Sequence, residues 1–332
     1  MKDVYNYHKN ALSVENILQA RDAINADITR TPLCACPALS DDVVEVRLKL
    51  ETLQASGAFK LRGATNAIKK LGAEQLKAGV VCASTGNHGR AVALAASRLG
   101  VPSTICMSAL VPQNKLDAIK NLGATIKVIG SSQDDAQVEV DRLVAEQGLS
   151  EIPPFDHADV VAGQGTIGLE LMEDWADLDT VIIPLSGGGL LAGILIAIKS
   201  FNTNINVIGV SMERGAAMYR SLQKGAPAEV IEQETLADSL GGGIGLGNQF
   251  TFQIVQDLVD DVVLLSEAQI AAGMQFLYRE HGLVVEGAAA VGIPVLQNKL
   301  SDKIGKKVAV IISGRNVDLQ VFEDVMKGNL PY

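Results

Sequence analysis

Apolar and polar residues recur along this chain with two periods, one typical of strands and one typical of helices. Short apolar or alternating runs predict strands over residues 44–50, 80–83, 103–107, 125–129, 180–184, 207–210, 262–265 and 308–312. Apolar residues at helical spacing predict helices over residues 14–26, 60–71, 87–99, 115–122, 133–147, 190–201, 216–223, 267–280 and 286–297. Because strands and helices take turns, the pattern predicts an α/β fold in which helices cover parallel twisted sheets.

The chain is long enough for more than one domain. Its 332 residues, 48% of them hydrophobic, can bury a sizeable core and suggest two domains, or one large unit with a subdomain. An irregular segment at residues 149–159, which contains Pro153 and Pro154, interrupts the rhythm of strands and helices. We interpret this segment as the point where the chain crosses between two sheets.

Charge and composition exclude several classes of protein. The net charge is -10 and no run of lysine and arginine stands out, so we expect no nucleic-acid partner. The four cysteines form no C-x-x-C pair, which argues against a zinc site and fits a reducing cytoplasm. Residues 180–198 carry no charge, but Pro184 and three glycines interrupt them, so we expect a strand, a loop and a helix and no membrane association. The polar segment 1–9 contains no apolar core typical of a signal peptide.

A glycine-rich loop follows the predicted strand at residues 180–184 and opens the next helix. Residues 186–189 read Ser-Gly-Gly-Gly, and consecutive glycines allow backbone N–H groups to wrap closely around an anion at a helix start. No Gly-Lys-Ser/Thr follows, so a nucleoside-triphosphate loop is not predicted. We favour a phosphate site here over the alternative, a tight turn with close packing of strand and helix.

Two further polar loops also follow predicted strands. Residues 84–89, Ser-Thr-Gly-Asn-His-Gly, offer hydroxyl, amide and backbone N–H groups to a carboxylate or a phenolate oxygen. Residues 313–316, Ser-Gly-Arg-Asn, lie at another strand end, where open parallel sheets bind ligands. Either loop is equally well explained as a cap of the helix after it, because serine, threonine and asparagine are favoured caps regardless of function.

One lysine, Lys60, stands among small residues where the helix 60–71 is predicted to begin. Lysine forms Schiff bases with carbonyl compounds once burial or a neighbouring cation lowers its pKa, and pyridoxal 5'-phosphate (PLP) is the commonest cofactor held this way. Considered alone, Lys60 is better explained as a surface charge. Together with a phosphate loop and two polar loops at strand ends, it predicts a PLP site.

A second glycine motif, at residues 163–168, matches the dinucleotide pattern G-x-G-x-x-G. That fingerprint requires an acidic residue for the ribose about twenty residues later. Residues 183–188 read Ile-Pro-Leu-Ser-Gly-Gly and contain none. A nicotinamide cofactor is therefore not predicted.

These motifs together resemble the fold-type II PLP enzymes, the group of threonine and serine dehydratases and serine racemase. The resemblance covers nearly the whole chain and rests on residues 56–63, 84–89, 161–167, 186–189 and 313–316. Residues 211–215, 237–243 and 313–316 look most like those of hydroxyectoine-utilisation dehydratases. The resemblance implies a tryptophan synthase β-like fold with a large PLP-binding domain, residues 1–75 and 150–332, and a small mobile domain, residues 76–149. The sequence does not fix the oligomeric state, and we expect a homodimer because dimers are the commonest oligomers.

The resemblance further implies roles for individual residues. Lys60 carries the cofactor and moves the Cα proton, Phe59 packs on the ring, Asn87 holds its 3'-oxygen and Ser313 bonds the ring nitrogen. The implied phosphate cradle is Ser186, Gly187, Gly188, Gly189 and Leu190. The implied carboxylate-binding residues are Ser84, Thr85, Gly86, Asn87 and His88. The activity that follows is β-elimination from a β-hydroxy amino acid to a 2-oxo acid and ammonia.

This chain departs from the group at three places. Thr85 stands where the racemase has a serine acting on the second face of the substrate, and its stiffer side chain favours elimination. The positions of the group's metal loop hold Ser211, Gly215 and Ala217, which cannot form an oxygen cage, so no metal is expected. Arg315 replaces a usual glycine and is predicted to contact a long substrate, the alternative being a side chain that faces solvent or pairs with Asp318.

The sequence leaves the substrate open. Threonine, serine, hydroxyaspartate and a hydroxyectoine-derived, acetylated hydroxydiaminobutyrate all fit a β-hydroxy amino-acid site. Racemisation and β-replacement, as in cysteine synthases, remain alternatives within the same chemistry. A PLP-binding protein without turnover is a third possibility, which the intact Lys60, Thr85 and Ser313 disfavour.

Overall fold

Two parallel sheets organise the molecule, whose computed structural model describes residues 12–84, 86–109, 113–130 and 133–330. The larger sheet has six strands in the order β1 (Leu33–Ala35), β2 (Glu45–Leu50), β10 (Lys307–Ile312), β7 (Thr180–Pro184), β8 (Asn206–Met212) and β9 (Asp261–Leu265). Its strands run parallel except β1, which pairs antiparallel with β2.

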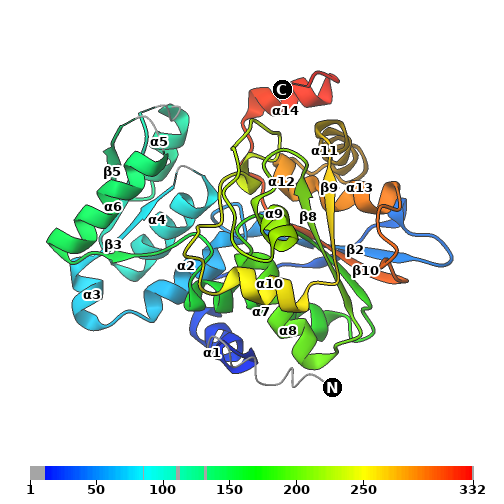
Figure 1. Ribbon diagram of the computed structural model, residues 1–332, viewed down its shortest axis with the longest axis horizontal. Coiled ribbons are helices and arrows are strands. Elements are labelled where there is room, and N and C mark those ends of the chain that lie inside the picture. The colour runs from blue at the N-terminus through cyan, green and yellow to red at the C-terminus, as the bar shows by residue number, and fades with distance from the viewer. Residues whose placement is uncertain (1–11, 85, 110–112, 131–132, 331–332) are drawn as a thin grey trace.

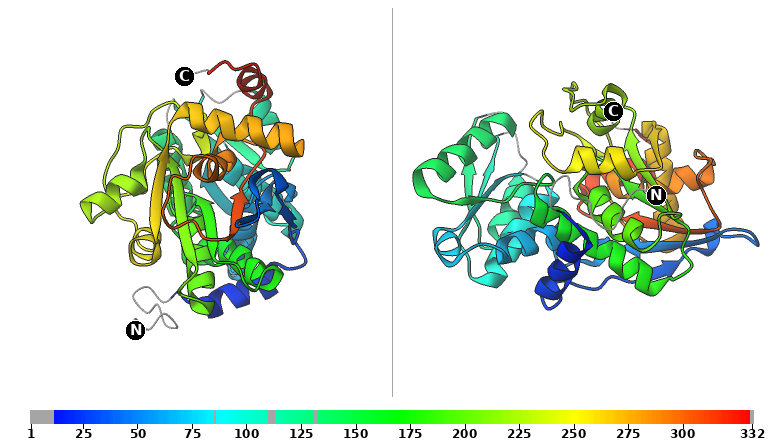
Figure 2. Two further views of the ribbon diagram at one scale, coloured as in Figure 1. Left: turned by 90° about the vertical axis from the view of Figure 1, so that its right-hand side faces the viewer. Right: turned by 60° about the horizontal axis from the view of Figure 1, so that its bottom comes forward.

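The smaller sheet has four parallel strands in the order β5 (Thr125–Val128), β4 (Ser103–Met107), β3 (Val80–Ala83) and β6 (Ser150–Glu151). Figure 1 shows this sheet in the lobe at the left, with helices α3 (Ala73–Ala78), α4 (Asn87–Leu99), α5 (Gln113–Lys120) and α6 (Gln133–Gln147) around it. The right-hand view of Figure 2 shows the same two lobes from below. The predicted α/β class, with helices covering parallel sheets, is confirmed.

The remaining helices belong with the larger sheet or between the two. They are α1 (Val14–Ile24), α2 (Lys60–Lys69), α7 (Ala158–Asp174), α8 (Gly189–Phe201), α9 (Ala217–Lys224), α10 (Thr251–Leu258), α11 (Glu267–His281), α12 (Gly287–Ala290), α13 (Gly292–Gln297) and α14 (Leu319–Met326). Three short 3-10 turns complete the order: η1 (Pro37–Leu39), η2 (Glu51–Leu53) and η3 (Asp238–Leu240).

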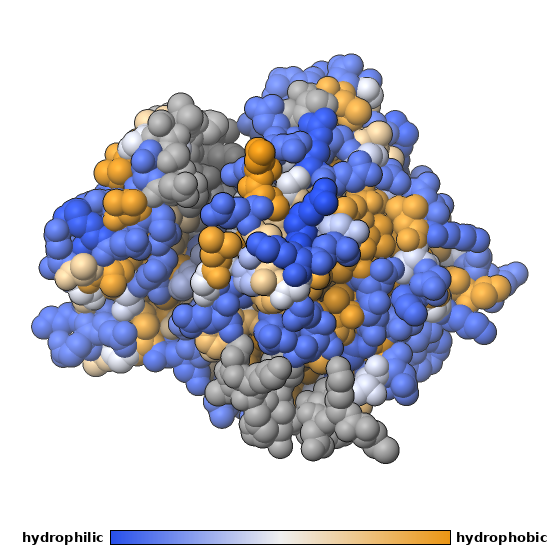
Figure 3. Space-filling model, viewed as in Figure 1, coloured by the Kyte–Doolittle hydropathy of each residue, from blue (hydrophilic) through white to orange (hydrophobic). Residues whose placement is uncertain are grey.

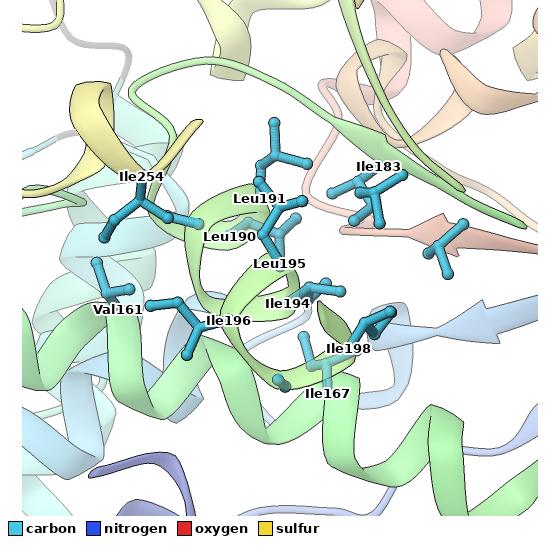
Figure 4. Packing of buried hydrophobic residues seen from close by; sticks show 14 of the residues in the cluster. Val161, Ile167, Ile183, Leu190, Leu191, Ile194, Leu195, Ile196, Ile198 and Ile254 are labelled. Atoms are coloured by element: carbon cyan, nitrogen blue, oxygen red, sulfur yellow. The ribbon is translucent and has the colours of Figure 1, made fainter. Parts of the chain in front are cut away.

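Helix α8 is the centre of the larger core. It is apolar on all sides, which is typical of a helix buried on every face. Figure 4 shows Leu191 and Ile194 of this helix packing near Ile183 of β7, while Ile196 faces Val161 of α7. The uncharged stretch 180–198 is therefore a buried strand, a loop and a buried helix, as its sequence predicts.

The G-x-G-x-x-G stretch lies inside helix α7 and not in a strand-to-helix turn. Its glycines permit close helix packing: a Cβ at Gly163 would lie 2.6 Å from the Cα of Gly63 in α2, and one at Gly165 would lie 2.9 Å from the carbonyl oxygen of Gly193 in α8. The motif is explained by packing, because side chains there would push three helices apart.

Several elements differ from the prediction. The sequence pattern missed α3, α7, α10, α14 and the short strands β1 and β6. No helix was predicted over α7, because its glycines have a low intrinsic helix propensity and the helix forms where α2 and α8 pack closely against them. The single helix predicted over residues 286–297 is two helices that meet at Val291, just before Pro294, whose ring cannot continue an undistorted helix.

A buried cluster of charges joins β2, α2 and α7. Arg62 is fully buried and donates to both carboxylate oxygens of Glu51, at 2.8 and 2.9 Å, and of Glu170, at 2.6 and 2.9 Å. Lys49, also fully buried, lies 2.6 Å from Glu170 and donates to the carbonyl oxygen of Thr31 at 2.7 Å. The arginine two residues after Lys60 is therefore a structural anchor for the start of α2.

The surface in Figure 3 is mostly hydrophilic, with apolar residues scattered among charged ones. Within the described ranges, no helix is both long enough and apolar enough to cross a bilayer.

Candidate active site

Strands β2, β10 and β7 run parallel, so their carboxyl ends meet at one edge of the larger sheet. The Lys60 segment follows β2, and Ser313 follows β10 directly. The backbone N–H of Phe59 donates to the carbonyl oxygen of Ser313 at 3.0 Å, and Ala58 forms an isolated bridge with Gly314. Backbone pairing therefore places Ser313, which is 3% exposed, beside the residue before Lys60.

Lys60 begins helix α2 and is partly buried. Its Nζ donates to the carbonyl oxygen of Pro154 at 2.5 Å and lies 5.3 Å from the ring centroid of Phe59. Burial lowers the pKa of Lys60 to about 8, although the negative charge of Glu286 opposes the shift. A large fraction of this amine is consequently neutral, and nucleophilic, at mildly alkaline pH.

The glycine loop opens helix α8 next to the segment that contacts Lys60. Gly188 is the N-cap of α8, with a left-handed φ of 88°, and a Cβ there would lie 2.8 Å from the terminal carbon of Met218. A Cβ at Gly189 would lie 3.0 Å from the backbone of Phe155, and one at Gly187 would overlap the Phe155 ring. Because Pro154 precedes Phe155, one segment positions both the lysine and the glycine loop.

Asp156, the next residue in that segment, fixes a neighbouring loop. Its carboxylate accepts the backbone N–H groups of Gln249, Phe250 and Thr251, at 2.6, 2.9 and 2.9 Å. Thr251 begins helix α10 and lies against Gly188. The carboxylate thus caps α10 and holds it against the glycine loop.

The start of α4 reaches the larger sheet through Asn87. Its Nδ2 donates to Oε1 and Oε2 of Glu286 at 2.8 and 2.9 Å, and to Oγ of Ser239 at 3.5 Å. Its Oδ1 accepts from Nδ2 of Asn316 at 2.6 Å. The predicted partner of a ring oxygen therefore lies among polar groups contributed by three distant segments.

His88 is buried, and its ring contacts the backbone of the fold. One ring nitrogen, Nε2, lies 2.7 Å from the carbonyl oxygen of Ile152, and Nδ1 has no partner among the described groups. Burial, together with the nearby charge of Lys60, lowers the pKa of His88 to about 3. The ring is therefore neutral, and only the backbone of this residue is suited to hold an anion at the start of α4.

The other predicted site residues divide by exposure. Ser84 and Gly86 flank the start of α4 and are partly buried, while Thr85 lies outside the described residues. Arg315 is exposed; its backbone N–H donates to the carbonyl oxygen of Gly57 at 2.9 Å. Where the chain is described, no group of three or more His, Cys, Asp or Glu side chains could hold a metal ion. The absence of a metal requirement stays a prediction.

Sequence reasoning missed several residues of the site. Glu286 carried a readable signal, because it is the single acid in the apolar run over residues 283–291. Phe155, Asp156 and Arg90 carried none, since each acts through a contact with a residue 32 or more positions away, and Asn316 was noted only as part of the loop over residues 313–316.

The residues present fit PLP. A partly buried lysine with a lowered pKa, a helix start built of glycines and a buried serine at the end of β10 meet at one sheet edge. These groups match an aldehyde, a phosphate and a ring nitrogen. Fold and site together define a fold-type II PLP enzyme.

Comparisons with known proteins agree with this class. The family described as pyridoxal-phosphate dependent enzyme matches residues 24–314, and the chain belongs to it. A Sinorhizobium fredii protein, provisionally named a threonine dehydratase, is 51% identical over 96% of each chain. The L-threonine ammonia-lyase of Thermotoga maritima is 40% identical over 96% of this chain and 79% of its own. Maize serine racemase superposes with a TM-score of 0.89 at 32% identity, over 96% of this chain and 98% of its own.

Proposed function

We propose that this protein is a PLP-dependent ammonia-lyase that converts a β-hydroxy amino acid to a 2-oxo acid and ammonia. The observation that carries the proposal is Lys60, a partly buried amine with a pKa of about 8, held beside a glycine-rich helix start. The threonine dehydratase and ammonia-lyase names of its relatives support the same reaction class.

Each part of the proposed site has a separate role in the reaction. When bound, PLP withdraws electrons from the Cα of the amine attached to it. Lys60 holds the cofactor and then moves the Cα proton, for which a pKa of about 8 is well matched. The backbone N–H groups at the start of α4 would bind the substrate carboxylate, and the hydroxyl of Ser313 would hydrogen-bond the ring nitrogen. Residues 186–190 hold the phosphate at the start of α8.

A neutral serine hydroxyl at the ring nitrogen does not enforce its protonation, which favours elimination over transamination. Thr85, in place of the racemase serine, favours elimination over racemisation. We infer L-threonine, L-serine or a longer hydroxydiaminobutyrate as substrates, with Arg315 contacting the longer one from the strand end. A homodimer completes the proposal, and light scattering of the purified protein tests it.

The deciding experiment is release of 2-oxo acid and ammonia across a panel of β-hydroxy amino acids. We expect turnover by the native enzyme, and loss of both turnover and the cofactor's visible absorbance in Lys60→Ala. Turnover retained by this variant would contradict the assignment of Lys60 as the residue that holds PLP. Substantial D-serine formed from L-serine during partial turnover would reject elimination as the main reaction.

A further inference from the structure

The ring of His88 has one buried nitrogen whose hydrogen-bonding capacity is unused among the described residues. Its Nε2 lies 2.7 Å from the carbonyl oxygen of Ile152, and a carbonyl oxygen only accepts hydrogen bonds, so Nε2 carries the proton. The neutral ring therefore presents Nδ1 as a bare acceptor. Nδ1 is shielded from solvent and has no partner among the described groups. An unsatisfied buried acceptor costs stability and calls for an explanation.

Three observations place this ring beside the amine of Lys60. The carbonyl oxygens that hold the two side chains belong to Ile152 and Pro154, two residues apart in one segment. Helices α2 and α4 begin at Lys60 and one residue before His88, and these helices pack against each other. The charge of Lys60 also contributes to the low pKa of His88, which requires the two groups to lie close together.

We propose that Nδ1 of His88 accepts a hydrogen bond from the amine of Lys60 whenever that amine is free, and so positions the amine to take the Cα proton of the substrate. This inference rests on the proposed function. The side chain of Lys60 is long and flexible, so rotation about its bonds moves the amine from the carbonyl oxygen of Pro154 to Nδ1.

A neutral ring suits this role because it holds the amine without competing for its proton. The pKa of His88 is about 3 and that of Lys60 is about 8, so a proton on Lys60 does not pass to the ring. A carboxylate at the same place would instead favour the ammonium form of Lys60, which cannot accept the Cα proton. His88 is therefore a positioning residue, and Lys60 moves the proton.

Two substitutions at position 88 separate the two ring nitrogens. The amide of asparagine lies close to the place of Nδ1, whereas the amide of glutamine lies close to the place of Nε2. We expect His88→Asn to keep kcat for L-threonine within about twofold of the native value, and His88→Gln to lower it by about three- to tenfold, the range for one hydrogen bond. KM should change little in either variant, because backbone N–H groups hold the substrate carboxylate.

A kinetic isotope effect identifies the step that is slowed. Deuterium at Cα of threonine slows only the transfer of the Cα proton, so its effect on kcat should rise in His88→Gln and stay near the native value in His88→Asn. His281→Gln is the matched control: its ring contacts Cys36, and both kcat and the isotope effect should stay unchanged. An active His88→Gln with a slow His88→Asn would show that the contact with Ile152 is what matters, and would overturn the proposal.

Nitrogen NMR supplies a readout that does not depend on turnover or on a variant. The resonance of a bare Nδ1 moves upfield when the nitrogen accepts a hydrogen bond, and with four histidines in the chain the signals can be assigned one by one. L-2-Aminobutyrate lacks a β-hydroxyl, so it takes the place of Lys60 on PLP and frees the amine without elimination. We expect the Nδ1 resonance of His88 to move upfield when this compound is added to the native holoenzyme, while the resonances of His157 stay unchanged. A resonance that is already shifted before the addition, and does not move after it, would identify a fixed water as the partner of Nδ1 and would overturn the proposal.

The outcomes separate this inference from the proposed function. Threonine turnover with the same kcat in the native enzyme, His88→Asn and His88→Gln overturns the role of His88 and leaves the ammonia-lyase assignment intact. Absence of elimination from every β-hydroxy amino acid, with the His88 resonance still moving when L-2-aminobutyrate is added, rejects the ammonia-lyase assignment and supports the contact between His88 and Lys60.

Discussion

Asn87 and Glu286 face each other between the two sheets, with Nδ2 of the amide 2.8 and 2.9 Å from the two carboxylate oxygens. The same carboxylate accepts from Oγ of Ser239 at 3.4 Å and opposes the lowering of the Lys60 pKa. Glu286 therefore connects the start of α4 to the larger sheet and contributes negative charge near the amine of Lys60.

The first prediction concerns the binding of PLP to the cofactor-free protein. Only the neutral amine of Lys60 attacks an aldehyde, so the rate of reconstitution should rise with pH through a midpoint of about 8. Because the charge of Glu286 raises the pKa of Lys60, Glu286→Gln should move this midpoint to lower pH. Growth of the cofactor's visible absorbance at pH 6 to 10 measures both.

Glu323→Gln, on the exposed face of α14, is the control and should leave the midpoint unchanged. A native midpoint near the ordinary lysine pKa, or an upward shift in Glu286→Gln, would contradict the environment described for Lys60.

His88 makes the second prediction, on stability. Its pKa is about 3 in the folded protein and near 6.5 in the unfolded chain, so the unfolded state binds the extra proton as the pH falls below 6.5. The buried ring thus contributes stability above pH 6.5 that is lost as the pH falls toward 3. In His88→Asn, the free energy of unfolding should depend less steeply on pH between 6 and 5, by about 1.4 kcal/mol per unit.

Urea denaturation at several pH values measures this slope. An unchanged slope in His88→Asn would mean that His88 protonates alike in both states. His157→Asn provides a comparison with another histidine, because the His157 ring accepts the backbone N–H of Asp159 at the start of α7.

The sequence predicts which segments meet at one edge of the larger sheet, but not the contacts that join them to other segments. Lys60, Gly188 and Ser313 follow strands, and the carboxyl ends of parallel strands share one edge, so their proximity follows from the fold. The contacts of Phe155 with Gly187 and of Asn87 with Glu286 join segments far apart in the chain, and no local pattern encodes them. Helix α7 was missed for a related reason. Its glycines have a low helix propensity, and the contacts with α2 and α8 that stabilise the helix involve segments far apart in the chain.

The third prediction tests the glycine loop. A methyl group at Gly187 overlaps the ring of Phe155, so Gly187→Ala should weaken PLP binding and cost about 1–3 kcal/mol of stability. The double variant Gly187→Ala/Phe155→Ala should recover part of the loss caused by the alanine, because the ring is gone. Thermal unfolding and PLP titration of the native protein, Gly187→Ala, Phe155→Ala and the double variant complete the double-mutant cycle.

Gly247→Ala is the control, since a Cβ there has no atom within 4 Å and its φ is not in the left-handed region. Independent, additive effects of the two substitutions would show that Phe155 is not what excludes a side chain at position 187.

The last prediction concerns Arg62, which holds Glu51 and Glu170 in the core. Although burial acts in the opposite direction, the Arg62 guanidinium lowers the pKa of Glu51 below its ordinary value. Arg62→Met fills much of the space but leaves two buried carboxylates, and should cost about 3–5 kcal/mol at pH 7. Without the cation the pKa of Glu51 rises, so acidification that protonates the carboxylates should narrow the gap between variant and native protein.

Adding Glu51→Gln to Arg62→Met should restore part of the stability at pH 7, since a neutral amide needs no cation, while Glu170 keeps its ion pair with Lys49. Arg98→Met, at an exposed position, should cost less than about 1 kcal/mol. Urea denaturation at pH 7 and pH 5 measures each variant. A penalty for Arg62→Met that stays the same at both pH values would mean that lost packing, rather than unpaired charge, makes Arg62 necessary where α2 presents Lys60.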